Sequence, residues 1–133
     1  MFSIKIDNDI HKGIDLISID FLIPHEEVLL DKKEILKNNL KYKDQSVIIS
    51  SIIVCHESFV IIDGHHRFTA LKELGVKKIP VTLINYLHKD IRTSDNSSIL
   101  KEDLIRNAKK NKLYSPKSTK HSVFCLDGKL WSP

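Results

Sequence analysis

A run of five polar residues at positions 63–67 combines the groups from which anion-binding sites are built. The guanidinium of Arg67 can donate paired hydrogen bonds to a phosphate or a carboxylate, and histidine nitrogens can add further donors. The two histidines are neighbours in the chain, so their side chains point in different directions and could hardly chelate one metal ion together. The cluster therefore favours binding of an anion, and it consists of Asp63, Gly64, His65, His66 and Arg67.

The flanking residues predict that this cluster lies where a strand turns into a helix. Phe59–Ile62 is a short apolar run, typical of a buried strand, and Phe68, Leu71 and Leu74 then recur at helical spacing until Gly75. The first N–H groups of a helix lack partners within the helix and lie at the positive end of its dipole, so they attract phosphate. The alternative is a turn whose polar residues merely face water, and the density of polar groups argues against it.

A second cluster contains two acidic residues, Glu26 and Glu27, directly after Pro24 and His25. Glutamate at the start of a helix commonly does no more than compensate the helix dipole. A carboxylate beside a phosphate site can instead act as a general base toward a hydroxyl group. The sequence leaves both interpretations open.

The third cluster combines hydroxyl groups, lysines and a histidine without an intervening apolar residue. Such groups can hold a second part of an anionic ligand. The alternative is a basic loop that faces water. The sequence contains no Walker A loop, zinc pattern or Ser/His/Asp arrangement. This cluster reads Tyr114, Ser115, Pro116, Lys117, Ser118, Thr119, Lys120 and His121.

Length and composition set the outer limits of the interpretation. A chain of 133 residues has the size of one domain, and we expect a single domain over residues 1–133. No apolar run reaches the ~18 residues that span a bilayer, and the first residues lack the apolar core of a signal peptide. Cys55 and Cys125 have no CxxC partner, so we expect buried, reduced thiols in a cytoplasmic protein. A net charge of +4 suits an anionic ligand but is too small to indicate wrapping by nucleic acid.

Strand-like and helical patterns alternate along the chain. They predict an α+β, or mixed α/β, fold with a small mixed sheet and flanking helices. We expect strands at Asp15–Ile19, within Val47–Cys55, and at Phe59–Ile62, Lys78–Asn85 and Val123–Leu126. The second and third of these could form a hairpin. We expect helices within 28–40 and at His65–Leu74 and Ile99–Lys110, a polar linker at Thr93–Ser98, a loop at Tyr114–His121 and a turn at Asp127–Gly128.

At its three polar clusters the chain resembles the free L-serine kinases of the ParB/sulfiredoxin superfamily. The matching elements are Ile23–Glu26, Ile62–Arg67 and Tyr114–His121, and they occur in the family's order. The resemblance implies a ParB/sulfiredoxin-like domain that transfers a phosphoryl group from ATP or ADP to the hydroxyl of free L-serine, giving O-phospho-L-serine. It also implies Mg²⁺ as cofactor and the nucleotide and serine as partners, with no membrane contact. Nucleic acid is not expected as a partner.

The resemblance also implies roles for individual residues. Glu26 and Asp63 match the catalytic carboxylates, and Asp63 could also hold Mg²⁺. The residues that match the phosphate-binding motifs are Gly64, His65, His66, Arg67, Ser118, Thr119, Lys120 and His121.

The chain departs from the family pattern in two respects. Lys120 stands where the family has arginine, which keeps the charge but loses bidentate geometry. The segment from about Leu87 to Leu113 is too short to contain the large insertion of the archaeal members, so a substrate contact made by that insertion is absent or rebuilt. The phosphate donor, the oligomeric state and the pathway of the product, such as cysteine biosynthesis, stay open.

Two alternatives come from the same superfamily. A ParB-like nucleotide- or DNA-binding regulatory protein would usually continue into a helix-turn-helix, and no recognition helix is expected after Leu113. Sulfiredoxin-like repair needs a nucleophilic cysteine in the loop where His65 stands. A non-catalytic nucleotide-binding module is the third alternative.

Overall fold

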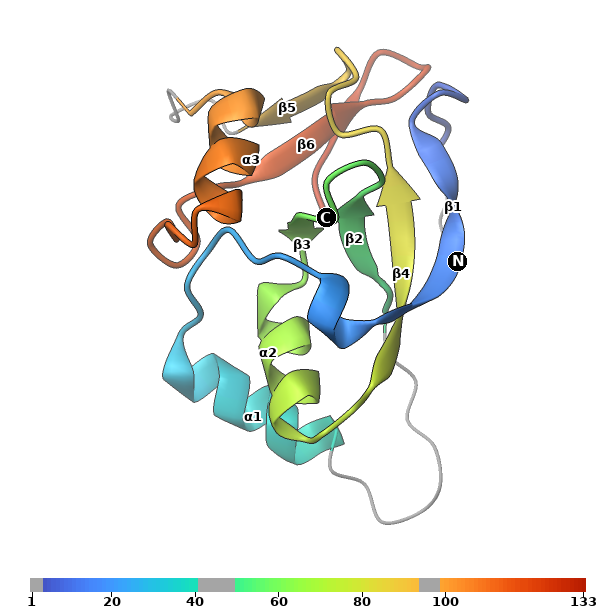
Figure 1. The fold of residues 1–133 in the computed structure, drawn as a ribbon. Helices are drawn as coiled ribbons and strands as arrows, with labels where there is room; N and C mark the ends of the chain where they lie inside the picture. Colours follow the sequence, from blue (N-terminus) through green and yellow to red (C-terminus); the bar gives the residue numbers. More distant parts are fainter. Residues whose placement is uncertain (1–3, 41–49, 94–98) are drawn as a thin grey trace.

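A four-stranded mixed sheet forms the centre of the molecule (Figure 1). The computed structural model describes residues 4–40, 50–93 and 99–133. The strand order is β1-β4-β2-β3, in which β2 and β4 are parallel and the other pairs antiparallel. The four strands are β1 (His11–Ser18), β2 (Ile52–Cys55), β3 (Ile61–Asp63) and β4 (Lys78–Ile84).

Two helices cover one face of this sheet. After the 3-10 turn η1 (Ile19–Phe21), the chain forms α1 (Leu30–Leu40), which packs against α2 (His65–Glu73). The ammonium group of Lys33 lies 2.9 Å from a carboxylate oxygen of Glu73 and so links the two helices. The core between α2 and the sheet consists of Ile19, Leu22, Ile52, Val54, Ile61, Phe68, Leu71, Ile79 and Val81.

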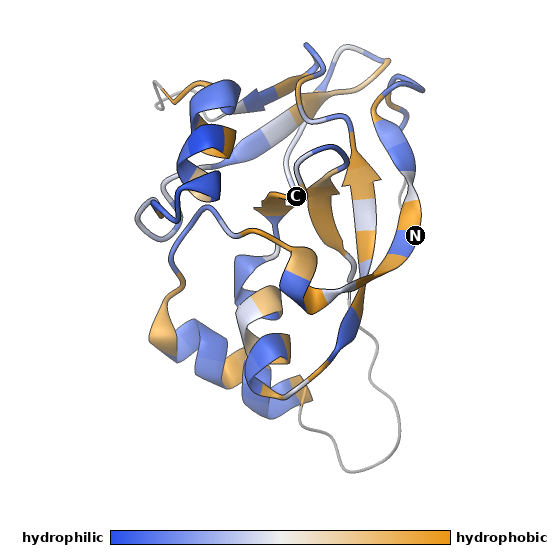
Figure 2. Ribbon diagram, in the orientation of Figure 1, coloured by the Kyte–Doolittle hydropathy of each residue, from blue (hydrophilic) through white to orange (hydrophobic). Residues whose placement is uncertain are grey.

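A second layer covers the opposite face. It contains the antiparallel strands β5 (Ile91–Thr93), β6 (His121–Phe124) and β7 (Leu130–Trp131) and the helix α3 (Lys101–Lys109). Because β2 has an apolar core on both faces, it is hydrophobic along its whole length (Figure 2). The second core consists of Ile10, Cys55, Val60, Ile62, Tyr86, Ile91, Leu104 and Ala108.

The predicted mixed α/β fold is confirmed, and most elements lie within a few residues of their expected positions. The expected hairpin is present as the antiparallel pair β2–β3. The strand expected at Asp15–Ile19 begins earlier, at His11, because backbone pairing with β4 holds it while Ile14 and Leu16 stay 71% and 60% exposed. The alternation of apolar and polar residues therefore predicts only part of strand β1.

Several expectations were incomplete or cannot be compared with the structure. The sequence did not indicate β5 or β7, which are only three and two residues long. Residues 47–49 of one expected strand and residues 94–98 of the expected linker lie outside the described part of the chain. Cys55 is buried, but Cys125 is only half buried; both thiols are free. Among the described residues no helix is long and apolar enough to cross a membrane.

Candidate functional site

The segment Ile23–Glu27 brings the three polar clusters together. On one side, the N–H of Ile23 donates to the carbonyl of Phe59 at 2.9 Å, and the N–H of Ile61 donates back to Ile23 at 2.8 Å. On the other side, Tyr114 donates to the carbonyl of His25 and accepts from the N–H of Glu27, both at 2.9 Å. The segment therefore lies between the strand that leads to Asp63 and the loop that begins at Tyr114.

A cleft of about 680 Å³ opens where these segments meet. All the residues predicted from the sequence line it except Ser118, whose hydroxyl donates to the carbonyl of Ser115 at 2.6 Å within the loop. The lining residues are Glu26, Leu36, Ile62, Asp63, Gly64, His65, His66, Arg67, Lys117, Thr119, Lys120, His121, Ser132 and Pro133.

The N-terminus of α2 forms one wall of the cleft. The first hydrogen bond of the helix runs from the N–H of Phe68 to the carbonyl of Gly64 at 2.9 Å, so the N–H groups of the three preceding residues have no acceptor within the helix. Gly64 has φ +106°, and a Cβ at this position would lie 2.9 Å from Nη2 of Arg67 and 3.1 Å from Cγ1 of Ile52. Only glycine fits this turn without strain. The predicted strand-to-helix anion site thus has the backbone geometry that it requires.

Arg67 is held at the cleft with donors to spare. Its Nη2 donates to the carbonyl of Ser51 at 3.3 Å and to Oδ2 of Asp63 at 3.5 Å. In the described part of the chain, Nε of Arg67 is the one buried side-chain polar atom without a hydrogen-bond partner. A buried orphan donor on a guanidinium is costly unless an anion satisfies it, and it therefore points to a ligand.

The three histidines of the predicted site are neutral and make hydrogen bonds within the protein. Nε2 of His65 accepts from the N–H of His25 at 3.1 Å, and Nε2 of His66 accepts from the N–H of Leu29 at 3.0 Å. Nε2 of His121 lies 2.8 Å from the hydroxyl of Tyr86.

Burial is the main cause of this neutrality. It lowers the pKa of His65 to about 2 and that of His121 to about 3, with the neighbouring His25 adding to both effects. It also lowers the pKa of His66. The positive charge of the cleft therefore comes from Arg67 and the lysines, and His65 and His66 can still offer their backbone N–H groups.

Glu26 is fixed by the loop that faces it. Its side chain is only 9% exposed, and Oε1 accepts from the N–H of Lys117 at 2.6 Å. Oε2 accepts from the hydroxyl of Thr119 and, at 3.4 Å, from the N–H of that residue. Lys117 has φ 59°, a left-handed conformation that is uncommon outside glycine and occurs preferentially at functional sites.

These contacts bear on the two interpretations of Glu26. Helix α1 begins at Leu30, four residues after Glu26, so the carboxylate is not in its first turn. Dipole compensation therefore does not account for its position. Glu27, in contrast, is exposed.

Asp63 is the second carboxylate of the cleft and is more accessible, with its side chain 42% exposed. It lies directly before the anion-binding turn and is paired only weakly with Arg67. A single carboxylate beside a phosphate site fits Mg²⁺, which is usually held by one or two carboxylates together with phosphate oxygens and water. Asp63 is therefore the residue of this cleft that could hold the ion.

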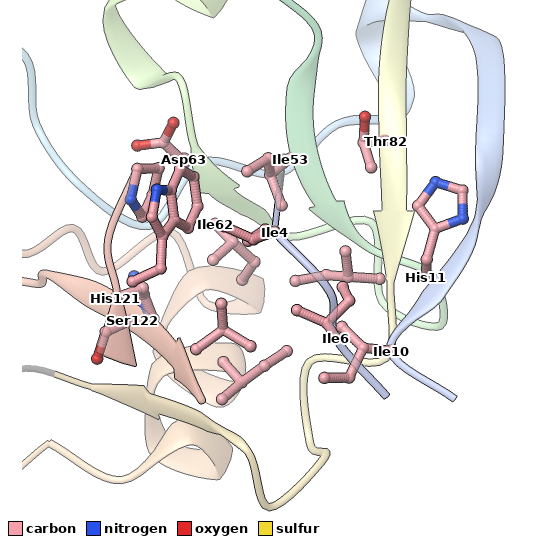
Figure 3. A pocket seen from close by; sticks show the side chains of 15 residues that line it. Ile4, Ile6, Ile10, His11, Ile53, Ile62, Asp63, Thr82, His121 and Ser122 are labelled. Carbon is pink, nitrogen blue, oxygen red and sulfur yellow. The ribbon is translucent and has the colours of Figure 1, made fainter. Parts of the chain in front are cut away.

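An apolar cavity of about 160 Å³ adjoins the cleft (Figure 3). Asp63 and His121 lie at one end of it, Ile6 and Ile10 line the other end, and Ile4 lies beside Ile62 between them. Ile62 is also shared by the cavity and the cleft. A ligand in the cleft could thus extend an apolar group into the cavity.

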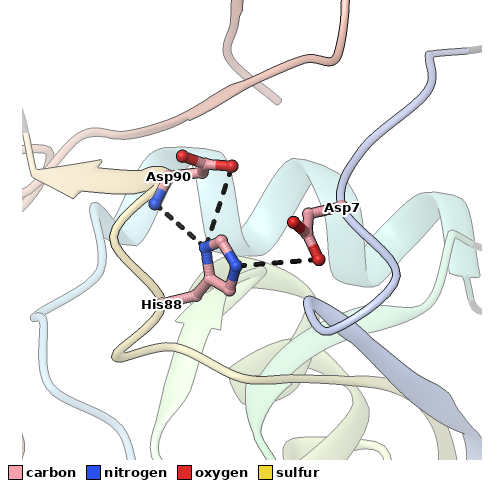
Figure 4. Close-up of side chains that lie close together, drawn as sticks. All are labelled: Asp7, His88 and Asp90. Atoms are coloured by element: carbon pink, nitrogen blue, oxygen red, sulfur yellow. Dashed lines mark hydrogen bonds and ion pairs between the residues drawn. The ribbon is translucent and has the colours of Figure 1, made fainter.

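A separate polar cluster, which does not line the cleft, consists of Asp7, His88 and Asp90 (Figure 4). Nε2 of His88 is 3.8 Å from Asp7, whereas Nδ1 is 3.9 Å from the carboxylate of Asp90 and accepts from its N–H at 3.0 Å. The two carboxylates approach opposite nitrogens of one ring, and Nδ1 already accepts a hydrogen bond from the backbone of Asp90.

Comparison with known proteins identifies the family. The ParB N-terminal domain model matches residues 14–104, and the chain belongs to this family. A protein named ATP-dependent L-serine kinase from Staphylothermus marinus is 36% identical over 81 residues, which are 58% of this chain and 31% of that protein. The ATP-dependent L-serine kinase SbnI of Staphylococcus aureus is 32% identical over 89 residues, and the match covers 65% of this chain and 34% of that protein. The resemblance to free serine kinases is thus confirmed, although the chain spans only about a third of the length of these two relatives.

A solved structure supports the fold over nearly the whole chain. A free serine kinase in complex with AMP has a TM-score of 0.72 and 14% identity, and the match covers 92% of this chain and 91% of that one. At this identity the likeness shows the fold, and the predicted ParB/sulfiredoxin-like fold is confirmed.

Sequence reasoning missed two residues that shape the site. His25 was seen only as part of a motif, but it is completely buried and joins its own cluster to the other two through hydrogen bonds to His65 and Thr119. A third hydrogen bond joins it to Ile61 at the start of β3. Lys117 supplies a backbone N–H to Glu26 and lines the cleft. The one sequence feature that could have indicated a role for His25 is its place directly before the candidate base Glu26. No feature of the sequence indicated the left-handed backbone of Lys117.

Proposed function

We propose that this chain is a free serine kinase that transfers a phosphoryl group from ATP or ADP to the hydroxyl of L-serine. The observation that carries the proposal is the convergence of a helix N-terminus, an arginine with an orphan donor and a buried glutamate on one cleft. The names of the relatives support it. The product would be O-phospho-L-serine.

The phosphate chain of the nucleotide would lie between α2 and the loop at 115–121. The N–H groups at the start of α2 and the guanidinium of Arg67 would bind one part of it, and Lys120 another. Phosphoryl transfer depends mainly on positioning and on neutralising the charge of the moving group, which these donors provide. The adjoining apolar cavity would receive the nucleobase.

Two carboxylates would complete the site. Glu26 would accept the proton of the serine hydroxyl, since it is the buried carboxylate that faces the cationic groups. Asp63 would hold Mg²⁺, which when bound neutralises phosphate charge. Thr119 and His121 would shape the wall of the cleft, and Ser118 would act by holding the loop conformation.

We infer one domain over residues 1–133, a cytoplasmic location and no requirement for nucleic acid or membrane. The alternative is a ParB-like nucleotide- or DNA-binding regulatory protein without kinase activity, and a ParB-like protein of Sulfolobus acidocaldarius is 33% identical over 90 residues. The orphan Nε of Arg67 and the buried Glu26 on one cleft favour the kinase, because binding of a nucleotide alone does not require a general base.

The direct test is to incubate the purified chain with L-serine, Mg²⁺ and either ATP or ADP, and to detect O-phosphoserine by mass spectrometry. We expect product with one or both donors, and no product when the nucleotide is omitted. Nucleotide binding without product from either donor would favour the regulatory alternative.

Gly64→Ala is expected to weaken nucleotide binding as well as stability. A side chain in the left-handed region costs about 1–2 kcal/mol, and here the new methyl group would also displace the guanidinium of Arg67. Gly75→Ala is the matched control, because Gly75 also has positive φ but nothing lies within 4 Å of its Cβ position. We expect both variants to lose stability in urea unfolding and only Gly64→Ala to lose nucleotide affinity. Equal nucleotide affinity in the two variants would contradict the role given to this turn.

A further inference from the structure

A continuous chain of hydrogen-bonding groups leads from Glu26 into the protein interior. Oε2 of Glu26 contacts the hydroxyl of Thr119, and this hydroxyl lies 2.7 Å from Nε2 of His25. Nδ1 of His25 lies 2.6 Å from the carbonyl oxygen of Ile61, which is the last group of this series. His25 is completely buried, and Thr119 is 8% exposed. The imidazole itself is therefore shielded from solvent.

When Glu26 is ionised, this series of hydrogen-bonding groups has three contacts but only two protons to fill them. The carbonyl of Ile61 can only accept, so Nδ1 of His25 carries the proton of the neutral imidazole. The hydroxyl of Thr119 has a single proton, which it can donate either to Glu26 or to Nε2 of His25 but not to both. One of the three contacts then lacks a hydrogen. Adding one proton satisfies all three.

We propose that Glu26, Thr119 and His25 form a proton relay that takes up the proton released by the acceptor hydroxyl and holds it on His25. The inference rests on the proposed kinase function. As the serine oxygen bonds to phosphorus and the nucleotide oxygen leaves, the serine O–H bond breaks and its proton passes to Glu26. Thr119 gives its own proton to Nε2 of His25 and receives the one from Glu26. Glu26 is again ionised, and His25 carries the positive charge.

The surroundings of His25 are suited to a temporary proton store. Burial lowers the pKa of His25, while its bond to Ile61 and the nearby Glu26 oppose that effect. The resting imidazole is therefore neutral, and its Nε2 is free to accept. The other titratable groups that face it are the rings of His65, His121 and Tyr114, at centroid distances of 4.4, 5.8 and 6.4 Å.

These neighbours do not compete for the proton. The pKa of His65 is lowered to about 2 and that of His121 to about 3, so both stay neutral over the working range. Glu26, with Oε2 at 3.9 Å from Nε2, is the carboxylate beside the ring. His25 does not touch the cleft and is a positioning residue that acts through Glu26.

Thr119→Val and Thr119→Ser form a matched pair for the kinetic test. Valine keeps the shape of threonine but removes the hydroxyl, whereas serine keeps the hydroxyl. We expect Thr119→Val to lower kcat about tenfold to a hundredfold, the effect of losing one hydrogen bond to a charged group. KM for both substrates should change little, and Thr119→Ser should restore most of the rate. Equal kcat in Thr119→Val and the parent would overturn the relay.

Histidine ¹⁵N NMR on the substrate-free protein provides a readout that does not depend on kinase activity. In the parent protein His25 should take up its second ring proton in a transition coupled to the negative charge of Glu26. In Glu26→Gln that transition should move to lower pH, because the negative charge that stabilises the imidazolium is gone. A His25 transition that is the same in the parent, Glu26→Gln and Thr119→Val would overturn the relay. A coupled transition in a protein that makes no phosphoserine would support the relay and contradict the proposed kinase function.

Discussion

Glu26→Gln is expected to lower kcat for phosphoryl transfer to serine about 10²–10⁴-fold, the usual contribution of a general base. Glutamine keeps the size of the side chain but cannot accept the proton of the serine hydroxyl. Nucleotide affinity should stay nearly unchanged, because the phosphate chain is bound by α2, Arg67 and Lys120. The measurement is steady-state phosphoserine formation together with calorimetric titration of the nucleotide.

Glu27→Gln is the matched control for this experiment. Glu27 carries the same charge one residue further on, but it is exposed, and its backbone N–H donates to the carbonyl of Tyr114. We expect the control to retain the activity of the parent. Comparable activity in the Glu26 and Glu27 variants would show that Glu26 only holds the loop at Lys117 and Thr119.

Arg67→Ala should weaken nucleotide binding by roughly tenfold to a hundredfold, since a hydrogen bond to a charged group is worth about 1.5–3 kcal/mol. Serine has no phosphate group, so its affinity should fall less. Lys120→Ala should act in the same direction on the nucleotide. Because the interaction is between charges, the loss should be largest at low ionic strength.

The control for charge is Arg106→Ala. Arg106 lies on α3 with its side chain 61% exposed and pairs only with Asp103 among the described acidic residues. Its removal changes the net charge by the same amount as Arg67→Ala. A similar loss of nucleotide affinity in both variants would mean that the general charge of the protein, and not the cleft, binds the nucleotide.

The local part of the site could be predicted from the sequence. A β-like run followed by glycine and a helical period indicates a strand-to-helix turn, and the structure has this turn at Gly64. The residue types at 63–67 then predict an anion site, since orphan N–H groups arise at every helix start. The structure adds the orphan Nε of Arg67 as independent support.

The long-range part could not be predicted from spacing. The contacts of Glu26 with Lys117 and Thr119 join residues about 90 positions apart, and they depend on the pairing of Ile23–Glu27 with two other segments. Only the family resemblance indicated that these motifs belong together. Nor does sequence reveal protonation: the rings of His65 and His66 were expected to add donors, but burial makes both neutral and their Nε2 atoms accept hydrogen bonds within the protein.

Phosphoserine formation and nucleotide consumption can be followed together by ³¹P NMR in a mixture of the chain, L-serine, Mg²⁺ and the active donor. We expect one phosphoserine to form for each nucleotide consumed, and Glu26→Gln to abolish both changes. Inorganic phosphate that accumulates in place of phosphoserine, with serine unchanged, would contradict the claim that this cleft delivers the phosphoryl group to a serine hydroxyl.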